Sequence, residues 1–201
     1  MSGLWIKICG MTTPEAVAAA LAARVDAIGF VFAESPRQVT PQRAVQLAAA
    51  AHGRVRCVAV TRHPSQQLVE EITNIFQPDV LQTDLMDISV LKLPRKLEIF
   101  PVLRAGDSQP QSLPARLLFE GQTSGSGAIC DWTGARALAQ RTQLVLAGGL
   151  NANNVAEAIS AVAPFGVDVS SGVEERPGIK SADKIAQFVA AARAASKGAM
   201  S

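Results

Sequence analysis

Few residues of the sequence could move a proton, and Cys9 is the most informative of them. It ends the apolar segment Trp5–Cys9 and precedes Gly10, so its thiol is expected at the rim of a folded unit. A thiol with a pKa of about 8.5 is only slightly ionised at neutral pH, so a general base needs help. Lys7 lies two residues earlier, on the same side of an extended strand, and its ammonium group favours the thiolate. The alternative is a small core residue, which is the role that suits Cys57.

Two segments rich in glycine and serine, Ala147–Asn151 and Ser170–Glu174, could bind an anion. Glycine allows backbone N–H groups to approach an anion closely, and serine hydroxyls add further donors. Each segment alone could be an ordinary tight turn, but together they favour a phosphate site. Its candidate residues are Gly148, Gly149, Ser170, Ser171 and Gly172.

Two charged residues could complete such a site. Asp131 follows a stretch with Gly125 and Gly127 that is typical of a mobile lid or an anion-contacting turn. It also precedes a predicted helix, so its carboxylate either caps that helix or acts on a substrate, and the residues alone leave both open. Arg37 follows a proline in another loop and suits a substrate carboxylate, because guanidinium forms bidentate pairs. The alternative for Arg37 is a surface side chain.

Short apolar runs bounded by turn residues recur eight times along the chain, and most precede an alanine-rich stretch with helical spacing. The predicted strands are Trp5–Cys9, Ala27–Phe32, Arg56–Val60, Val80–Gln82, Glu98–Leu103, Arg116–Phe119, Gln143–Ala147 and Gly166–Ser170. The predicted helices are Pro14–Arg24, Pro41–His52, Ser65–Phe76, Met86–Lys92, Gly134–Arg141, Asn153–Val162 and Ser181–Ala195. In the fifth unit, prolines and a glycine between Ala105 and Pro114 predict a loop in place of the helix.

Strand–helix alternation fits either an open doubly wound sheet or a closed barrel. Eight units in 201 residues favour an α/β fold with a single (β/α)₈ TIM barrel as the one domain, residues 1–201. In such a barrel the chemistry lies at the carboxyl ends of the strands, where all of the candidate residues above are expected.

The composition argues against several classes of function. The net charge is only +2, no basic run is present and tyrosine is absent, so a nucleic-acid partner is not expected. The sequence has no apolar stretch long enough to predict a membrane partner or export, so a cytoplasmic protein is expected. Three scattered cysteines and two histidines, His52 and His63, favour neither disulfides nor a metal site. The oligomeric state is left open between a monomer and a homodimer.

The chain resembles the phosphoribosylanthranilate isomerase family of tryptophan biosynthesis from about residue 6 to residue 188. The segments that carry the resemblance are Lys7–Thr12, Gly29–Phe32 with Ser35–Arg37, Gly125–Gly127 with Asp131–Trp132, Ala147–Leu150 and Val167–Glu174. The resemblance implies a (β/α)₈ barrel that catalyses the Amadori rearrangement of N-(5-phosphoribosyl)anthranilate to 1-(2-carboxyphenylamino)-1-deoxyribulose 5-phosphate. Such a reaction moves protons only, so no cofactor is expected.

By the same resemblance, Asp131 is the general acid and Cys9 is the general base. Arg37 lies near the anthranilate, and Gly149, Ser171 and Gly172 lie where the family binds phosphate. Asp168 takes a supporting polar role. Because residues two apart in a strand share a face and strand eight neighbours strand one, we expect Asp168 to pair with Lys7.

The chain also departs from the family, which commonly has Gln-Leu-His-Gly where this sequence has Leu81–Asp84, so that Thr83 replaces the histidine. Rival readings are another phosphosugar barrel, such as an epimerase or a histidine-pathway isomerase, and a non-catalytic barrel that binds a phosphorylated ligand. Metal-dependent epimerases need histidine ligands, and the sequence places neither His52 nor His63 at a suitable strand end. A binding barrel has no need of Cys9 and Asp131 together.

Overall fold

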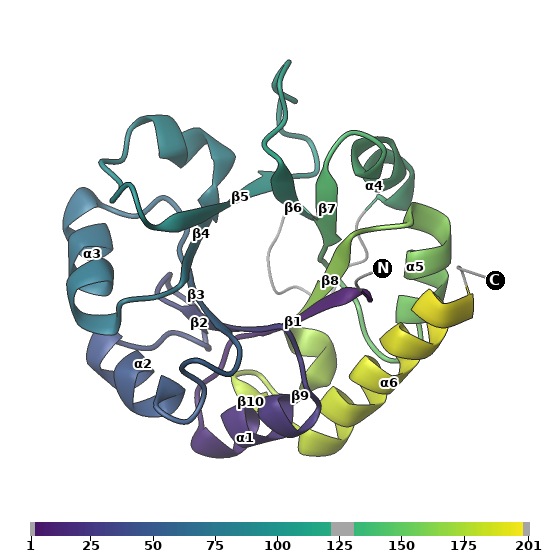
Figure 1. The fold of residues 1–201 in the computed structure, drawn as a ribbon, viewed down its shortest axis with the longest axis horizontal. Coiled ribbons are helices and arrows are strands. Elements are labelled where there is room, and N and C mark those ends of the chain that lie inside the picture. The colour runs from purple at the N-terminus through teal and green to yellow at the C-terminus, as the bar shows by residue number, and fades with distance from the viewer. Residues whose placement is uncertain (1–2, 122–130, 199–201) are drawn as a thin grey trace.

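The computed structural model describes residues 3–121 and 131–198, and its strands form a closed parallel barrel in sequential order from β1 to β8. Figure 1 shows the strands as an inner ring with helices outside it. The prediction of a (β/α)₈ barrel is therefore confirmed. The strands are β1 Trp5–Cys9, β2 Ala27–Val31, β3 Arg56–Val60, β4 Val80–Asp84, β5 Glu98–Arg104, β6 Arg116–Glu120, β7 Gln143–Leu146 and β8 Gly166–Val169.

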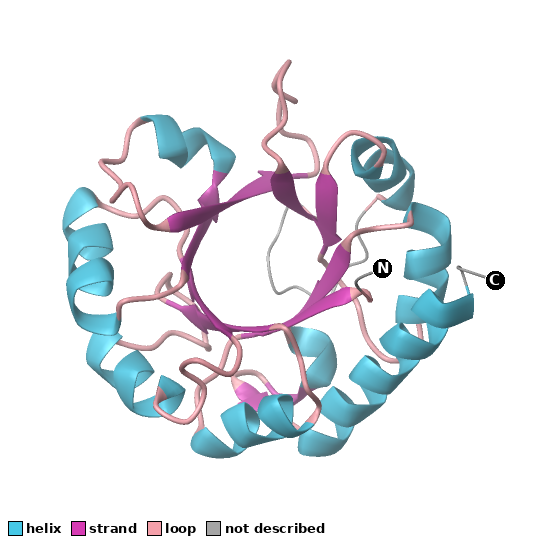
Figure 2. Cartoon of the chain, in the orientation of Figure 1, coloured by secondary structure: helices cyan, strands magenta, loops and turns pink. Residues whose placement is uncertain are grey.

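The outer ring contains the α-helices α1 Pro14–Ala22, α2 Pro41–Ala48, α3 Gln66–Glu71, α4 Trp132–Ala139, α5 Val155–Val162 and α6 Ala182–Gly198. A π-helix, η1 Ile72–Phe76, continues α3 (Figure 2). The predicted helix starts hold, since the hydroxyl of Thr13 caps α1 and that of Thr40 caps α2, each immediately before a proline.

Successive side chains of each strand point alternately outward and inward, and this divides the core into two layers. Side chains such as Ile6 and Ile8 of β1 point outward and pack against the helices. The next positions point into the barrel, where Ala27, Val58 and Leu118 are among the residues that fill the interior. Lys7 and Cys9 alternate with Ile6 and Ile8 in β1 and therefore also point inward.

The fourth and fifth units differ from the others. The predicted helix Met86–Lys92 is only a short 3₁₀-helix, η2 Leu85–Ser89. β4 extends two residues further than predicted and pairs with β5 as far as Asp84. Residues 105–115, which are all described, contain no helix, as the prolines predict.

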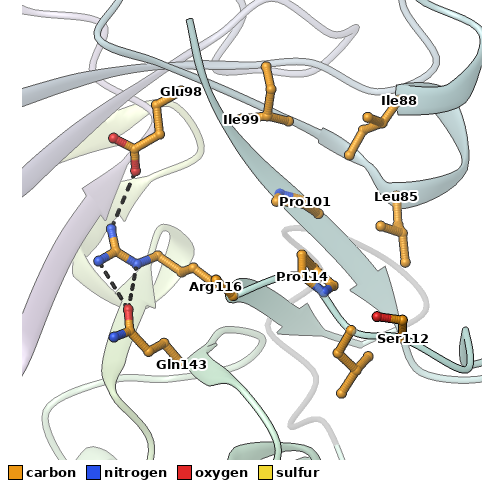
Figure 3. A pocket seen from close by; sticks show the side chains of 11 residues that line it. Leu85, Ile88, Glu98, Ile99, Pro101, Ser112, Pro114, Arg116 and Gln143 are labelled. Atoms are coloured by element: carbon orange, nitrogen blue, oxygen red, sulfur yellow. Dashed lines mark hydrogen bonds and ion pairs between the residues drawn. The ribbon is translucent and has the colours of Figure 1, made fainter.

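The missing fifth helix leaves a groove on the outer wall of the barrel (Figure 3). Leu85 and Ile88 of η2 line it on one side and Pro114 lines it on the other. Arg116 contacts Glu98 at 3.5 Å, and its Nη2 donates to Oε1 of Gln143 at 3.2 Å. Arg116, Glu98 and Gln143 are the first residues of β6, β5 and β7, so the groove reaches the amino ends of the strands. A barrel carries its chemistry at the opposite ends.

After β8 the chain forms a 3₁₀-helix, η3 Ser171–Val173, and a small hairpin of β9 Glu174–Arg176 and β10 Ile179–Lys180. The sequence predicted only a loop between β8 and the last helix. The hairpin turns at Pro177 and Gly178, and it lies over the rim of the barrel between α1 and α6 in Figure 1. Within the described residues, the helices are too short or too polar to span a membrane.

Candidate active site

One pocket opens at the carboxyl ends of the barrel strands. Four of the predicted site residues line it: Cys9, Arg37, Asp168 and Ser170. Asp131, Gly148, Gly149, Ser171 and Gly172 are not among the described residues of its lining. The structure thus brings the proposed base together with two charged side chains.

Cys9 and Asp168 line this pocket, and the fully buried Lys7 contacts Asp168. The Nζ of Lys7 donates a hydrogen bond to Oδ1 of Asp168 at 3.0 Å, which confirms the predicted pair. Lys7 and Cys9 meet over Gly29 of β2, where an added Cβ would lie 3.2 Å from the Lys7 Nζ and 2.9 Å from the Cys9 Sγ. A glycine is therefore needed at position 29 to make room for both side chains.

The ionisation of Cys9 differs from the sequence-based expectation. Burial raises the pKa of the Cys9 thiol, and Asp168 raises it further, whereas Lys7 and Lys180 lower it. Lys7 favours the thiolate as predicted, but the cost of burying the thiolate is larger, so the pKa rises above its usual value. Burial lowers the pKa of Lys7, but the attraction of Asp168 and Cys9 outweighs it and raises that pKa, so Lys7 stays an ammonium ion.

We therefore expect Cys9 in the free protein to react slowly with iodoacetamide at pH 7 and faster as the pH rises above 9. A buried thiol with a raised pKa exposes little nucleophilic thiolate at neutral pH. The rate is read by mass spectrometry of the peptide that contains Cys9, with the Cys57 peptide as an internal control, because burial raises the pKa of Cys57 to about 12. Fast, pH-independent alkylation of Cys9 between pH 6 and 8 would contradict a raised pKa.

Arg37 is not free to receive a substrate carboxylate with its whole guanidinium fork. Its Nε and Nη2 donate to the two carboxylate oxygens of Glu174 at 2.7 and 2.8 Å. The hairpin after β8 thus delivers a carboxylate from the protein itself to this guanidinium, a contact that the sequence did not predict. This pairing fixes the guanidinium at the pocket and leaves Nη1 as the nitrogen that the Glu174 pair does not use.

Lys180 links Glu174 to Ser170, the residue that follows β8. Its buried Nζ donates to Oε1 of Glu174 at 2.9 Å and to the backbone oxygen of Ser170 at 3.0 Å. Ser170 in turn donates its hydroxyl to the backbone oxygen of Cys9 at 3.0 Å. Although burial raises the pKa of Glu174, Arg37 and Lys180 outweigh it and lower that pKa. A continuous polar chain therefore supports the backbone at Cys9.

The two predicted phosphate loops lie against each other. Gly148 and Gly149 have φ angles of +91° and +67°, which favour glycine, so the turn after β7 depends on them. The side-chain nitrogen of Asn154 donates to the backbone oxygen of Gly149 at 2.9 Å and holds this turn. A Cβ at Gly172 would lie 1.9 Å from the backbone oxygen of Leu150, so only glycine allows the loops after β7 and β8 to touch.

Gly172→Ala is expected to lower the free energy of unfolding by about 1–3 kcal/mol, since the added methyl group overlaps backbone atoms that cannot rotate away. Urea unfolding followed by circular dichroism measures the change. Gly3→Ala is the control, because a Cβ at Gly3 meets nothing within 4 Å. Equal stability of both variants and the parent chain would show that the two loops do not pack as described.

Asp131 is the N-cap of α4, the structural alternative that the residues left open. Its Oδ1 accepts a hydrogen bond from the backbone N–H of Thr133 at 2.9 Å and its Oδ2 accepts one from that of Gly134 at 3.1 Å. The side chain is exposed. The glycine-rich stretch before it, including Gly125, Gly127 and Cys130, lies outside the described residues.

Several polar residues of the pocket were missed by the sequence analysis. Gln82 lines it from β4 with a buried side-chain oxygen that has no hydrogen-bond partner among the described residues. Arg104 pairs with Asp84 at 2.6 Å and also binds Glu120, and both Arg104 and Glu120 line the pocket. The sequence could have indicated these residues, because each of them lies near the carboxyl end of a predicted strand. Glu174 belongs to a segment that the sequence predicted to bind phosphate, and no role was predicted for its own side chain. The Pro-Gly pair before Lys180 was the sequence sign of the hairpin turn.

The position of His63 differs from the sequence-based expectation that this residue lies away from the strand ends. His63 lies in the loop after β3, and its Nδ1 is 3.0 Å from Oδ1 of Asp87 and 4.0 Å from Oδ2 of Asp84. The sequence hid this arrangement because β4 was predicted to end at Gln82, so Asp84 was not placed at the end of a strand.

Comparison with known proteins agrees with the fold and the site. A model of the N-(5'-phosphoribosyl)anthranilate isomerase family matches residues 6–191. The N-(5'-phosphoribosyl)anthranilate isomerase of Brucella canis is 39% identical over 202 residues, which cover 91% of each chain. The crystal structure of TrpF from Jonesia denitrificans is 37% identical with a TM-score of 0.80, covering 96% of this chain and 98% of that one.

A third relative carries a ligand. It is a phosphoribosylanthranilate isomerase in complex with reduced 1-(o-carboxyphenylamino)-1-deoxyribulose 5-phosphate, 26% identical with a TM-score of 0.79, and the match covers 95% of this chain and 99% of that one.

A closed barrel with its ionisable side chains at the carboxyl ends of the strands defines a (β/α)₈-barrel enzyme. The family match extends over nearly the whole barrel, and two of the relatives reported above share more than a third of their residues with this chain. The chain belongs to the N-(5'-phosphoribosyl)anthranilate isomerase family, and it is therefore an isomerase of tryptophan biosynthesis.

Proposed function

We propose that this protein catalyses the Amadori rearrangement of N-(5-phosphoribosyl)anthranilate to 1-(2-carboxyphenylamino)-1-deoxyribulose 5-phosphate, with Cys9 as general base and Asp131 as general acid. The observation that carries the proposal is that Cys9 and Asp168 line the pocket at the carboxyl ends of the strands, with the buried ammonium group of Lys7 bound to Asp168. It places a thiol next to an ammonium group where a barrel positions its substrate.

The reaction needs two proton transfers. Asp131 in its acid form gives a proton to the ribose ring oxygen while the bond from C1 to that oxygen breaks, and the nitrogen lone pair forms a protonated Schiff base at C1. The Cys9 thiolate then removes the proton from C2, and the electron pair of that bond moves toward the nitrogen. The resulting enolamine becomes the C2 ketone as C1 gains a proton. Each transfer contributes about 10²- to 10⁴-fold to the rate.

The raised pKa of Cys9 gives Lys7 a specific task in this mechanism. A thiolate formed in the buried pocket needs a fixed positive charge, and the ammonium group of Lys7 is held there by Asp168. The carboxylate of Asp168 opposes part of this effect, because it raises the pKa of the Cys9 thiol. Burial therefore disfavours the thiolate in the free protein, and Lys7 stabilises the thiolate that accepts the proton from C2.

The remaining predicted residues anchor the substrate. We assign the phosphate to the loops with Gly148, Gly149, Ser171 and Gly172, because glycine allows backbone N–H groups to approach an anion closely. Arg37 takes the anthranilate carboxylate through Nη1, since Glu174 occupies its other donors. Gln82 Oε1, which has no partner in the described protein, accepts a hydrogen bond from a sugar hydroxyl.

The experiment is to follow the loss of substrate fluorescence when purified protein is mixed with N-(5-phosphoribosyl)anthranilate. We expect catalytic turnover without added metal or cofactor. A parallel assay with the substrate of a histidine-pathway isomerase tests the rival phosphosugar reaction. Binding of the substrate without turnover would instead support the non-catalytic barrel and overturn the proposal.

We also propose that the protein acts in the cytoplasm, as one domain, as a monomer or a homodimer. Its substrate is a small phosphorylated molecule, and neither a nucleic acid nor a membrane takes part. Light scattering coupled to size-exclusion chromatography distinguishes the two oligomeric states.

A further inference from the structure

A second group of ionisable side chains lies at the ends of β3 and β4, outside the lining of the Cys9 pocket. His63 comes from the loop after β3, Asp84 ends β4 and Asp87 lies in η2, and one donor atom of each lies within 4.8 Å of the others. Asp84 and Asp87 are buried, whereas His63 is exposed. Three donors from three segments of the chain therefore converge at one point of the rim.

Asp84 supplies an oxygen that lacks a partner. The residue is 3% exposed, and its Oδ1 accepts a hydrogen bond from Nε of Arg104 at 2.6 Å. Its Oδ2 is buried and has no hydrogen-bond partner among the described residues. His63 Nδ1 lies 4.0 Å from this oxygen, which is too far for a hydrogen bond. Because an unsatisfied buried carboxylate oxygen is costly, this atom faces a position that a positive ligand would fill.

Asp87 adds a second carboxylate whose described hydrogen bonds include no lysine or arginine. It accepts hydrogen bonds from the backbone N–H of His63 at 3.1 Å and from the hydroxyl of Thr83 at 3.2 Å, and its Oδ1 lies 3.0 Å from Nδ1 of His63. None of these groups is a permanent cation. Two buried carboxylates thus lie beside a single imidazole.

We propose that His63, Asp84 and Asp87 bind one divalent metal ion of the manganese or zinc type. One imidazole nitrogen and two carboxylate oxygens form a mixed donor set that suits such ions, with water at the remaining positions. Donors bound at about 2.0–2.2 Å to one ion lie roughly 3 to 3.6 Å apart. The observed separations of His63 Nδ1, 3.0 Å from Asp87 and 4.0 Å from Asp84, require only small side-chain rotations to reach this range.

The ion would join two segments that border the active-site pocket. Thr61 and Arg62 line that pocket immediately before His63, and Gln82 lines it two residues before Asp84. A metal bound at His63 and Asp84 fixes the loop after β3 to the end of β4 and so restrains Arg62. The site does not depend on the proposed isomerisation, because none of its donors belongs to the catalytic group.

The test is a titration of chelator-treated full-length protein with MnCl₂, in which electron paramagnetic resonance measures the free Mn²⁺. Mn²⁺ is the probe because it prefers oxygen and imidazole over the thiols of Cys9 and Cys57. We expect one bound Mn²⁺ per chain. His63→Gln should weaken binding at least tenfold, and Asp84→Asn should do the same. His52→Gln is the matched control, since His52 is also exposed but belongs to no such group.

His63→Gln keeps the test independent of folding, because the His63 side chain is 55% exposed. Mn²⁺ should raise the midpoint of thermal unfolding by several degrees in the parent chain and in His52→Gln, but not in His63→Gln. Binding of much less than one Mn²⁺ per chain, or equal affinity in the parent chain and His63→Gln, would overturn the proposal. The group would then be only a hydrogen-bonded histidine–aspartate pair.

Discussion

Cys9→Ser is expected to lower kcat for N-(5-phosphoribosyl)anthranilate by about 10²- to 10⁴-fold, with little change in KM. Serine is nearly isosteric with cysteine, so the side chain still fits between Lys7 and Gly29. Its hydroxyl ionises far less readily than a thiol, and Lys7 cannot supply enough stabilisation for an alkoxide. The change therefore removes the base and leaves the phosphate and carboxylate anchors in place. Steady-state kinetics at saturating substrate measures the loss.

The pH dependence of the parent enzyme gives the same prediction a second test. Because burial raises the pKa of Cys9, the thiolate fraction of the free protein grows as the pH rises. When removal of the C2 proton by Cys9, and not ring opening by Asp131, limits the rate, kcat/KM should increase from pH 6 to above pH 9. The increase should be absent in Cys9→Ser. Cys57→Ala is the control, since Cys57 is buried in the outer core and lies outside the pocket lining. Cys9→Ser with more than a tenth of the parent kcat would exclude Cys9 as the base.

The barrel and part of its site could be predicted because they depend on short-range patterns. Strand periodicity places Lys7 and Cys9 on one face, and sequential parallel order brings β8 beside β1, so the contact between Lys7 and Asp168 follows from pattern and topology. The fifth unit lacks a helix because prolines interrupt it. Each of these features is set by residues close in sequence or by the closure of the barrel.

The remaining features depend on tertiary contacts that no local pattern specifies. Glu174 reaches Arg37 only because the hairpin after β8 folds back over the rim, and the two residues are 137 positions apart. The sign of the pKa change at Cys9 depends on how deeply the thiol is buried, which competes with the charge of Lys7. His63 and Asp84 meet because β4 continues beyond the residue at which its apolar character ends. The burial of Cys9 and the full length of β4 could therefore not be predicted from the sequence.

Asp131→Asn is expected to lower kcat by about 10²- to 10⁴-fold without a measurable change in stability. Asparagine caps helices about as well as aspartate, so its side-chain oxygen still accepts a hydrogen bond from the backbone of α4. It cannot, however, give a proton to the ribose ring oxygen. The substitution therefore separates the proposed acid role of Asp131 from its role as N-cap, and kinetics together with thermal unfolding measures both.

Asp131→Ala provides the contrast, because it removes the cap as well as the acid. It should lose activity as Asp131→Asn does and also cost about 1 kcal/mol of stability. If Asp131 is only an N-cap, the order of the two variants is different: Asp131→Asn keeps full kcat, and any loss in Asp131→Ala follows its loss of stability. An exposed carboxylate that binds two backbone N–H groups needs no catalytic role to explain its position. A large drop in kcat for a variant that keeps the cap would therefore be evidence that the same carboxylate also acts on the substrate.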